Sequence, residues 1–148
     1  YKKIIIYPNV DSGNKKIIEL IQRYKNRADY KVFKNIDRES FKRILKNSTL
    51  ILGNSSCGIL EAPTFKIPAI NIGNRQRDRM QAANVINCDY KIKNIKNALK
   101  YALNNKSFKK RIKSCKNPYG NGKSSKKIVK ILKKIKIDRQ LLDKRMTY

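Results

Sequence analysis

Small, polar and charged side chains gather in one stretch of the sequence, residues 53–61, which reads G-N-S-S-C-G-I-L-E. Ser55 and Ser56 offer hydroxyl groups, and the glycines allow a ligand to approach the backbone closely. An apolar run precedes this stretch and a short helical pattern follows it, so a strand-to-helix turn is expected here. Backbone N–H groups at the start of a helix favour an anion. The spacing therefore predicts a phosphate-binding turn.

Two charged residues extend the chemistry of this turn. Arg75 follows the next apolar run and is placed to pair with the same phosphates. Glu61 lies one turn into the short helix, where its carboxylate would repel a phosphate. It fits better further out, accepting hydrogen bonds from a sugar diol such as that of ribose. The alternative is a surface glutamate that is favoured by the helix dipole.

Other kinds of site find little support in the residue types. The sequence has no histidine, which excludes Ser-His and Cys-His nucleophile mechanisms within this chain. Its three cysteines are widely spaced and form no C-x-x-C pair, so neither a metal nor a cofactor is expected. We interpret Cys57 as a small filler of the turn, not as a nucleophile. The Walker and G-x-G-x-x-G phosphate motifs are also absent.

The elements that must position these residues alternate between strands and helices. Apolar runs predict strands, and stripes of period 3.6 predict helices. An α/β fold follows, with a Rossmann-like parallel sheet and helices on both faces. Ligands bind such a sheet beyond the carboxyl ends of its strands, where the loops 8–14, 53–58 and 73–79 are expected. Strands are predicted at residues 3–7, 30–33, 49–52, 68–72 and 85–88, and helices at 17–24 (capped by Asp11 or Ser12), 37–45 (capped by Asp37), 58–65, 92–103 and from Lys123.

The 148 residues suffice for one domain, which we place at residues 1–137, followed by a tail at 138–148. The chain begins in a strand-like run without an initiator methionine, so we expect a fragment of a longer protein. No apolar run is long enough for a membrane span. The helix from Lys123 alternates lysines with aliphatic residues, as membrane-surface helices do, but packing of its apolar face on the sheet is the preferred interpretation. Unpaired cysteines favour a cytoplasmic protein.

The net charge of +27 raises the possibility of a nucleic-acid partner. Residues 91–148 hold 20 of the 37 basic residues and 2 of the 10 acidic ones. Most of the excess is lysine among abundant isoleucine and asparagine, which is the composition of an AT-rich genome. A basic nucleic-acid-binding domain therefore remains the alternative of another class, and it rests on charge alone.

Several separated blocks of the sequence resemble one enzyme family in the same order. They are Y-P-N-V-D-S-G at residues 7–13, G-N-S-S-C-G-I-L-E-A-P at 53–63, P-A-I-N-I-G-N-R-Q at 68–76 and N-P-Y-G-N-G-K at 117–123. Together they look like the C-terminal half of hydrolysing UDP-N-acetylglucosamine 2-epimerases, in the sialic-acid and legionaminic-acid branch. The resemblance implies half of a two-domain, glycosyltransferase-B-like fold with the active site in the cleft.

The resemblance also implies roles for single residues. The two serines would bind the diphosphate, the glutamate the ribose, and the arginine the nucleotide or its phosphates, with Arg79 a weaker candidate. The residues expected to bind UDP are Asn9, Ser55, Ser56, Cys57, Gly58, Glu61, Arg75 and Gln76.

The reaction of this family removes the proton at C2 of the sugar and expels UDP by anti elimination. Water then adds and releases N-acetylmannosamine or a relative. The resemblance implies that carboxylates and a histidine outside this chain perform the proton transfers, so no catalytic residue is expected here and the isolated chain should be inactive. Its implied partners are a UDP-sugar, the missing N-terminal domain and further copies in a homo-oligomer. A UDP-2,4-diacetamido-sugar epimerase and a related glycosyltransferase remain alternatives.

Overall fold

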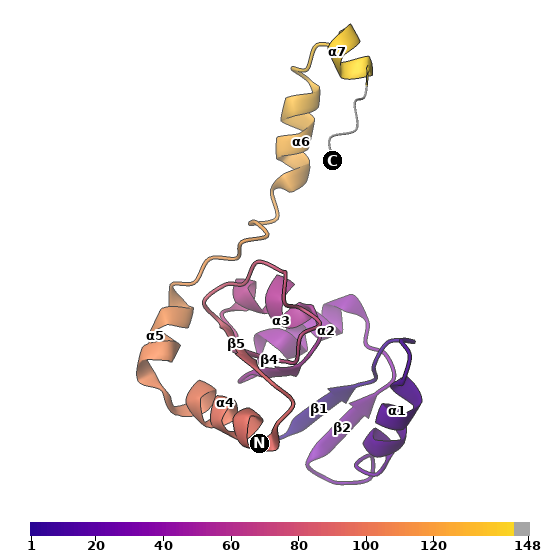
Figure 1. Ribbon diagram of the computed structural model, residues 1–148, viewed down its shortest axis with the longest axis vertical. Helices are drawn as coiled ribbons and strands as arrows, with labels where there is room; N and C mark the ends of the chain where they lie inside the picture. The colour runs from indigo at the N-terminus through magenta and orange to yellow at the C-terminus, as the bar shows by residue number, and fades with distance from the viewer. Residues whose placement is uncertain (144–148) are drawn as a thin grey trace. The chain divides into compact units, whose positions relative to one another are not determined.

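The computed structural model describes residues 1–143 and divides the chain into two compact units, residues 1–48 and 49–148. In the first unit, strand β1 (Lys3–Ile6) pairs in parallel with strand β2 (Tyr30–Phe33). Helix α1 (Asn14–Gln22) connects them and helix α2 (Arg38–Lys46) follows, as Figure 1 shows. A parallel pair needs such a crossover, so this is the predicted β-α-β arrangement.

The two helix starts of the first unit differ in how well the sequence predicted them. Asp37 caps α2 as expected, because its Oδ1 accepts a hydrogen bond of 2.9 Å from the backbone N–H of Ser40. That bond holds the pKa of the Asp37 carboxyl below its usual value. The expected cap of α1 by Asp11 or Ser12 is wrong. The chain turns at Gly13, whose φ of 85° suits glycine, and this residue occupies the cap position instead.

The second unit is built on a parallel sheet of three strands in the order β3-β4-β5. The register places Gly53 opposite Asn71, and Asn71 opposite Asn87. The carboxyl ends of all three strands therefore lie at one edge. Elements of this unit are β3 (Ile51–Gly53), α3 (Cys57–Leu60), the 3-10 helix η1 (Ala62–Phe65), β4 (Ala69–Ile72), β5 (Val85–Cys88), α4 (Ile92–Asn104), α5 (Lys106–Lys113), α6 (Ser124–Leu132) and α7 (Arg139–Leu142).

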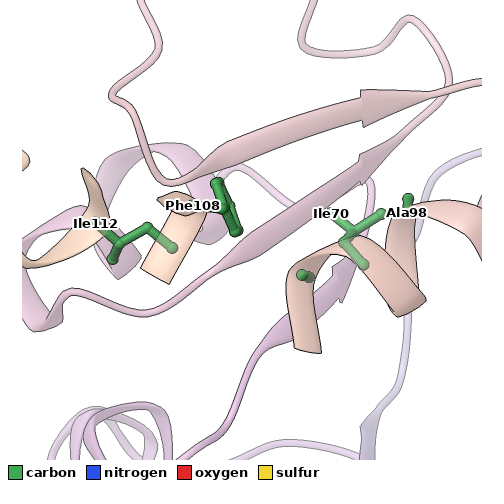
Figure 2. Packing of buried hydrophobic residues seen from close by; sticks show 5 residues of the cluster. Ile70, Ala98, Phe108 and Ile112 are labelled. Atoms are coloured by element: carbon green, nitrogen blue, oxygen red, sulfur yellow. The ribbon is translucent and has the colours of Figure 1, made fainter. Parts of the chain in front are cut away.

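Helices cover both faces of the three-stranded sheet. Ile70 of β4 joins a buried cluster with Ala98, Ala102, Phe108 and Ile112, so α4 and α5 pack on its side (Figure 2). The neighbouring Ala69 points to the opposite face, because successive side chains of a strand alternate. There it lies against the start of α3, since a Cβ added at Gly58 would sit 3.2 Å from the Ala69 Cβ. The predicted two-sided α/β architecture is therefore confirmed.

The helix predicted at residues 58–65 is broken into two short pieces. It is helical only at Cys57–Leu60 and continues as the 3-10 helix Ala62–Phe65. Pro63 explains the break, because it lacks the N–H that a continuous α-helix requires. Lys66 ends η1 in a left-handed conformation with φ of 59°. The short α3 therefore has a weaker macrodipole than a full helix would provide.

The last third of the chain departs most from the expected structure. Helix α5 was not expected; Asn105 starts it by accepting a 2.7 Å hydrogen bond from the N–H of Phe108. Helix α6 forms as predicted. The prediction that its apolar face packs on the sheet is wrong, since Ile131 and Leu132 are each 62% exposed. The predicted tail contains α7, and its residues 144–148 lie outside the described residues. No described helix is long and apolar enough to cross a membrane.

Candidate functional site

The turn that follows β3 contains the serines singled out in the sequence. Gly53 ends the strand with φ of 146°, and α3 begins at Cys57. The first turn of α3 is closed by the N–H of Ile59, which donates to the Ser56 carbonyl at 2.9 Å. Within residues 1–143, the backbone N–H groups of Ser55 and Ser56 donate to no protein acceptor. Two adjacent N–H groups at a strand-to-helix turn form a small anion site.

The side chains of this turn are partly committed to each other. Ser55 Oγ lies 3.0 Å from Cys57 Sγ and accepts a long bond of 3.4 Å from the Cys57 N–H. Burial raises the pKa of the Cys57 thiol and outweighs the hydrogen bond with Ser55, which lowers it; the Glu61 charge adds a smaller increase. The thiol is therefore protonated at neutral pH. This agrees with Cys57 as a filler of the turn and not as a nucleophile.

Glu61 is half-buried directly after α3, at the point where the helix breaks. Its N–H donates to the Cys57 carbonyl at 3.0 Å. Among the described residues, its carboxylate accepts no hydrogen bond and forms no ion pair. A half-buried carboxylate with this freedom is suited to accept bonds from ligand hydroxyl groups.

The loop after β4 is joined to the turn after β3 by Gln76. This residue is 4% exposed, and its Nε2 donates to the Asn54 carbonyl at 2.9 Å. The expected role of Gln76 is contact with the nucleotide, whereas the structure places its amide inside the protein, where it supports the turn. Arg75 and Arg79 are exposed in the same loop. The structure thus brings this loop to the serine turn, as the shared sheet edge predicted.

Two buried features hold α3 against the sheet, and only one of them lies among the expected site residues. Gly58 is a buried residue of α3 on the side that faces the strands. Its lack of a side chain permits close packing of the helix on Ala69. Asn84 is fully buried and was missed. Its Nδ2 donates to the carbonyls of Gly58 at 3.3 Å and Ile67 at 2.9 Å. The only signal in the sequence was a polar residue immediately before a predicted strand.

The N-P-Y-G-N-G segment, residues 117–122, also supports the site, through hydrogen bonds to the end of α3 and to η1. Asn117 Nδ2 donates to the Leu60 carbonyl and to Thr64 Oγ1, both at 2.8 Å. These bonds satisfy the end of α3, where a helix leaves its carbonyls without partners. The Lys66 ammonium adds a hydrogen bond to the Cys115 carbonyl. The segment at residues 117–122 therefore fixes the short helix and lies outside the turn itself.

A network of amide side chains occupies the carboxyl ends of β4 and β5. Asn71 is 5% exposed and donates from Nδ2 to Asn87 Oδ1 at 2.8 Å. Asn87 in turn donates to Gln81 Oε1 at 2.7 Å. A pocket of about 370 Å³ opens beside this network, lined by Gly73, Asn74, Arg77, Gln81, Asn87, Cys88, Asp89 and Tyr90.

Asn9 belongs to the other unit of the chain. It is exposed between β1 and α1, and its carbonyl accepts a 3.2 Å hydrogen bond from Asn14 Nδ2. Its expected contribution to UDP binding stays a prediction. No group of histidine, cysteine or acidic residues in the described part of the chain is arranged to hold a metal ion.

Comparisons with known proteins point in one direction. The family model described as UDP-N-acetylglucosamine 2-epimerase matches residues 1–133. A UDP-N,N'-diacetylbacillosamine 2-epimerase (hydrolyzing) of Legionella pneumophila is 39% identical over 145 residues, which are 98% of this chain and 37% of that protein. A UDP-N-acetylglucosamine 2-epimerase of Neisseria meningitidis serogroup B is 38% identical over 99 residues, which are 67% of this chain and 26% of that protein.

Solved structures agree with the sequence comparisons. The Methanocaldococcus jannaschii UDP-GlcNAc 2-epimerase, crystallised in complex with UDP-GlcNAc and UDP, matches with a TM-score of 0.65 and 26% identity. The match covers 88% of this chain and 35% of that one. The chain thus spans about a third of the length of the Legionella and Methanocaldococcus proteins. This likeness confirms the expected fold, a Rossmann-like part of a glycosyltransferase-B-like architecture.

Proposed function

The chain belongs to the UDP-N-acetylglucosamine 2-epimerase family, and we propose that it binds the UDP part of a nucleotide-sugar substrate. The observation that carries the proposal is the turn between β3 and α3. There the N–H groups of Ser55 and Ser56 have no acceptor among residues 1–143. A diphosphate oxygen supplies the acceptor that these groups lack, and the two hydroxyl groups add donors.

Glu61 and Arg75 complete the proposed nucleotide site. The Glu61 carboxylate, half-buried beyond the turn, accepts hydrogen bonds from the ribose hydroxyls. Arg75, in the loop that Gln76 joins to the turn, contacts the nucleotide or its phosphates. Asn9 lines the cleft in the whole protein, and Cys57 and Gly58 shape the backbone around the phosphates. These assignments rest on the family resemblance and on the donors and acceptors described above.

For the whole protein, we propose the hydrolysing reaction. A base takes the proton from C2 of the sugar, the electrons form the C1–C2 double bond, and UDP leaves from C1. Water then adds across that bond and gives the 2-epimeric free sugar. The Ser55–Ser56 turn stabilises the charge that develops on the departing UDP, which is electrostatic catalysis by fixed donors. The word "hydrolyzing" in the name of the Legionella relative supports this choice.

Two substrate classes are compatible with the relatives. One is UDP-N-acetylglucosamine, and the other is a UDP-2,4-diacetamido sugar such as the one named for the Legionella protein. The remaining part of the enzyme supplies the acid and base groups, so the isolated chain binds UDP weakly and releases none from a UDP-sugar. We further expect a cytoplasmic enzyme that acts as a homo-oligomer in the synthesis of nonulosonic acids or surface polysaccharide.

Parallel titrations of UDP and a random DNA duplex at two salt concentrations test this proposal against nucleic-acid binding. Counterion release makes the affinity of a basic protein for DNA fall steeply with salt. UDP that is held by backbone N–H groups and hydroxyls should keep most of its affinity and lose it on substitution of Glu61. DNA binding that exceeds UDP binding at both salt concentrations would instead favour the basic nucleic-acid-binding domain.

A further inference from the structure

The pocket at the carboxyl ends of β4 and β5 is lined by residues that lie outside the serine turn. Its volume of about 370 Å³ lies near the lower end of ligand pockets, which run from roughly 300 to 1,000 Å³. It is therefore large enough for one sugar ring and too small for a whole nucleotide sugar. Its lining shares none of the residues assigned above to UDP.

Tyr90 supplies an aromatic surface at this pocket. The residue is 70% exposed, so its ring is accessible to a ligand. Gly73 determines where the ring lies, because a Cβ at Gly73 would overlap the Tyr90 hydroxyl end. The hydroxyl is 3.5 Å from Asn74 Oδ1. A tyrosine offers an apolar face and a polar tip together, which matches the apolar C–H face and polar rim of a pyranose.

Polar side chains surround that aromatic surface. The Arg77 guanidinium has five N–H donors and, within the described part of the chain, no carboxylate or carbonyl partner. Asn74 is exposed and presents an amide at the rim. The side-chain amides of Asn87 and Gln81 line the pocket and hold each other in place. Asn87 Nδ2 donates to Gln81 Oε1 at 2.7 Å, and Gln81 Nε2 donates to Asn87 Oδ1 at 3.3 Å. Amides and a guanidinium provide both donors and acceptors, as hydroxyl and acetamido groups require.

The pocket is also joined physically to the proposed nucleotide site. Gly73 and Asn74 begin the same loop that contains Arg75 and Gln76, and Gln76 holds the serine turn at Asn54. The serine turn and the pocket therefore lie at the same edge of the sheet.

We propose that the pocket beside Tyr90 binds the acetamido-sugar ring of the nucleotide sugar, with the ring stacked on Tyr90 and its polar groups on Asn74 and Arg77. The inference rests on the proposed UDP site, because the diphosphate anchors the ligand at the turn. It assigns the sugar contact to two residues of the expected ligand-binding loop 73–79 and to Tyr90, which the sequence did not single out.

The test compares UDP with UDP-N-acetylglucosamine on the same chain, by NMR or calorimetric titration. Tyr90→Ala should weaken the UDP-sugar about three- to tenfold and leave UDP within about twofold, since an aromatic contact is worth about that much. Tyr90→Phe keeps the ring and should retain most of the affinity. Asn74→Ala should show the same selective loss. Arg77 is a poorer choice, because its charge acts on UDP as well.

Tyr1→Ala and Lys109→Ala are controls at exposed residues outside the pocket lining and should change neither affinity. Equal loss of UDP and UDP-sugar in Tyr90→Ala, or no loss of either, overturns the sugar pocket and leaves the UDP site intact. Failure of the unsubstituted chain to bind UDP while it binds free N-acetylglucosamine with dependence on Tyr90 would overturn the proposed function alone. Failure to bind any of the three ligands overturns both.

Discussion

Gln76 Nε2 lies 2.9 Å from the backbone oxygen of Asn54, so the loop after β4 holds the turn after β3. The donor residue is buried, because Gln76 is 4% exposed, and the bond itself is partly buried. The other amide atom, Oε1, is buried without a hydrogen-bond partner among the described residues. A buried amide oxygen without a hydrogen-bond partner lowers the stability of the folded chain. That Gln76 occupies this position despite the cost fits a role in shaping the turn.

Gln76→Ala tests this supporting role. Loss of the bond leaves the Asn54 carbonyl without its partner, so we expect a loss of about 1–3 kcal/mol in the free energy of unfolding and weaker UDP binding. Urea unfolding followed by circular dichroism measures the first, and UDP titration the second. Gln22→Ala, exposed at the end of α1, is the control. A variant of unchanged stability and UDP affinity would show that the Gln76 bond is dispensable.

Glu61→Gln tests the contact with the ribose. Hydrogen bonds to a charged acceptor are stronger than those to a neutral amide, so UDP should bind about tenfold more weakly. Inorganic pyrophosphate, which has no ribose, should bind as well as before or better. 2′-Deoxy-UDP provides the sharper comparison, because its affinity should depend less on Glu61 than that of UDP does. Equal dependence of all three ligands on Glu61 would exclude the ribose assignment.

Gly58→Ala tests the packing of α3 on the sheet. The added Cβ would lie 3.2 Å from the Ala69 Cβ, closer than ordinary contact, so a loss of about 1–3 kcal/mol in stability is expected. Ala69→Gly removes the opposing methyl group. If the two positions touch as described, the double variant should be less destabilised than the sum of the single ones, by about 0.5–3 kcal/mol. Strict additivity in urea unfolding would contradict the contact.

Asp37 gives a prediction for the dependence on pH. Its pKa is lowered in the folded chain by the hydrogen bond from Ser40, so its contribution is present above the usual aspartate pKa and is lost as the pH falls through the lowered value. Protection of the Ser40 amide from hydrogen exchange should weaken over that acidic range. Asp37→Asn keeps a capping oxygen without the titration, so its protection should not depend on pH there. Identical pH profiles of the two proteins would rule out the titrating cap.

The alternation of apolar runs with 3.6-period stripes was enough to predict parallel strand pairing and most helices, whereas the single expected sheet is divided into one sheet of two strands and one of three. The strands at residues 68–72 and 85–88 appear within one residue of their expected bounds, because each is a short, mostly apolar run next to turn-forming residues. Helix α5 was missed since its sequence, K-S-F-K-K-R-I-K, has only two apolar residues, Phe108 and Ile112. Both are buried by tertiary packing, which a local pattern does not reveal.

The candidate site shows a similar division. The serine turn could be predicted, because a strand, a run of small residues and a helix follow each other locally. Asn84 and Asn117 could not, since their hydrogen bonds join residues 17 to 57 positions apart in the chain. The apolar face of α6 was expected to be covered, and its residues are instead exposed. Local periodicity indicates that a face is apolar without showing what it packs against.

The Ser55 and Ser56 amides test the central claim most directly. Backbone amide resonances of the chain are followed while UDP is added at two salt concentrations. Binding at the turn should shift the Ser55 and Ser56 amide signals in a saturable way, with similar affinity at both concentrations, because these N–H groups gain an acceptor. Saturable shifts confined to the lysine-rich helices, with the two serine amides unmoved, would contradict the proposed UDP site.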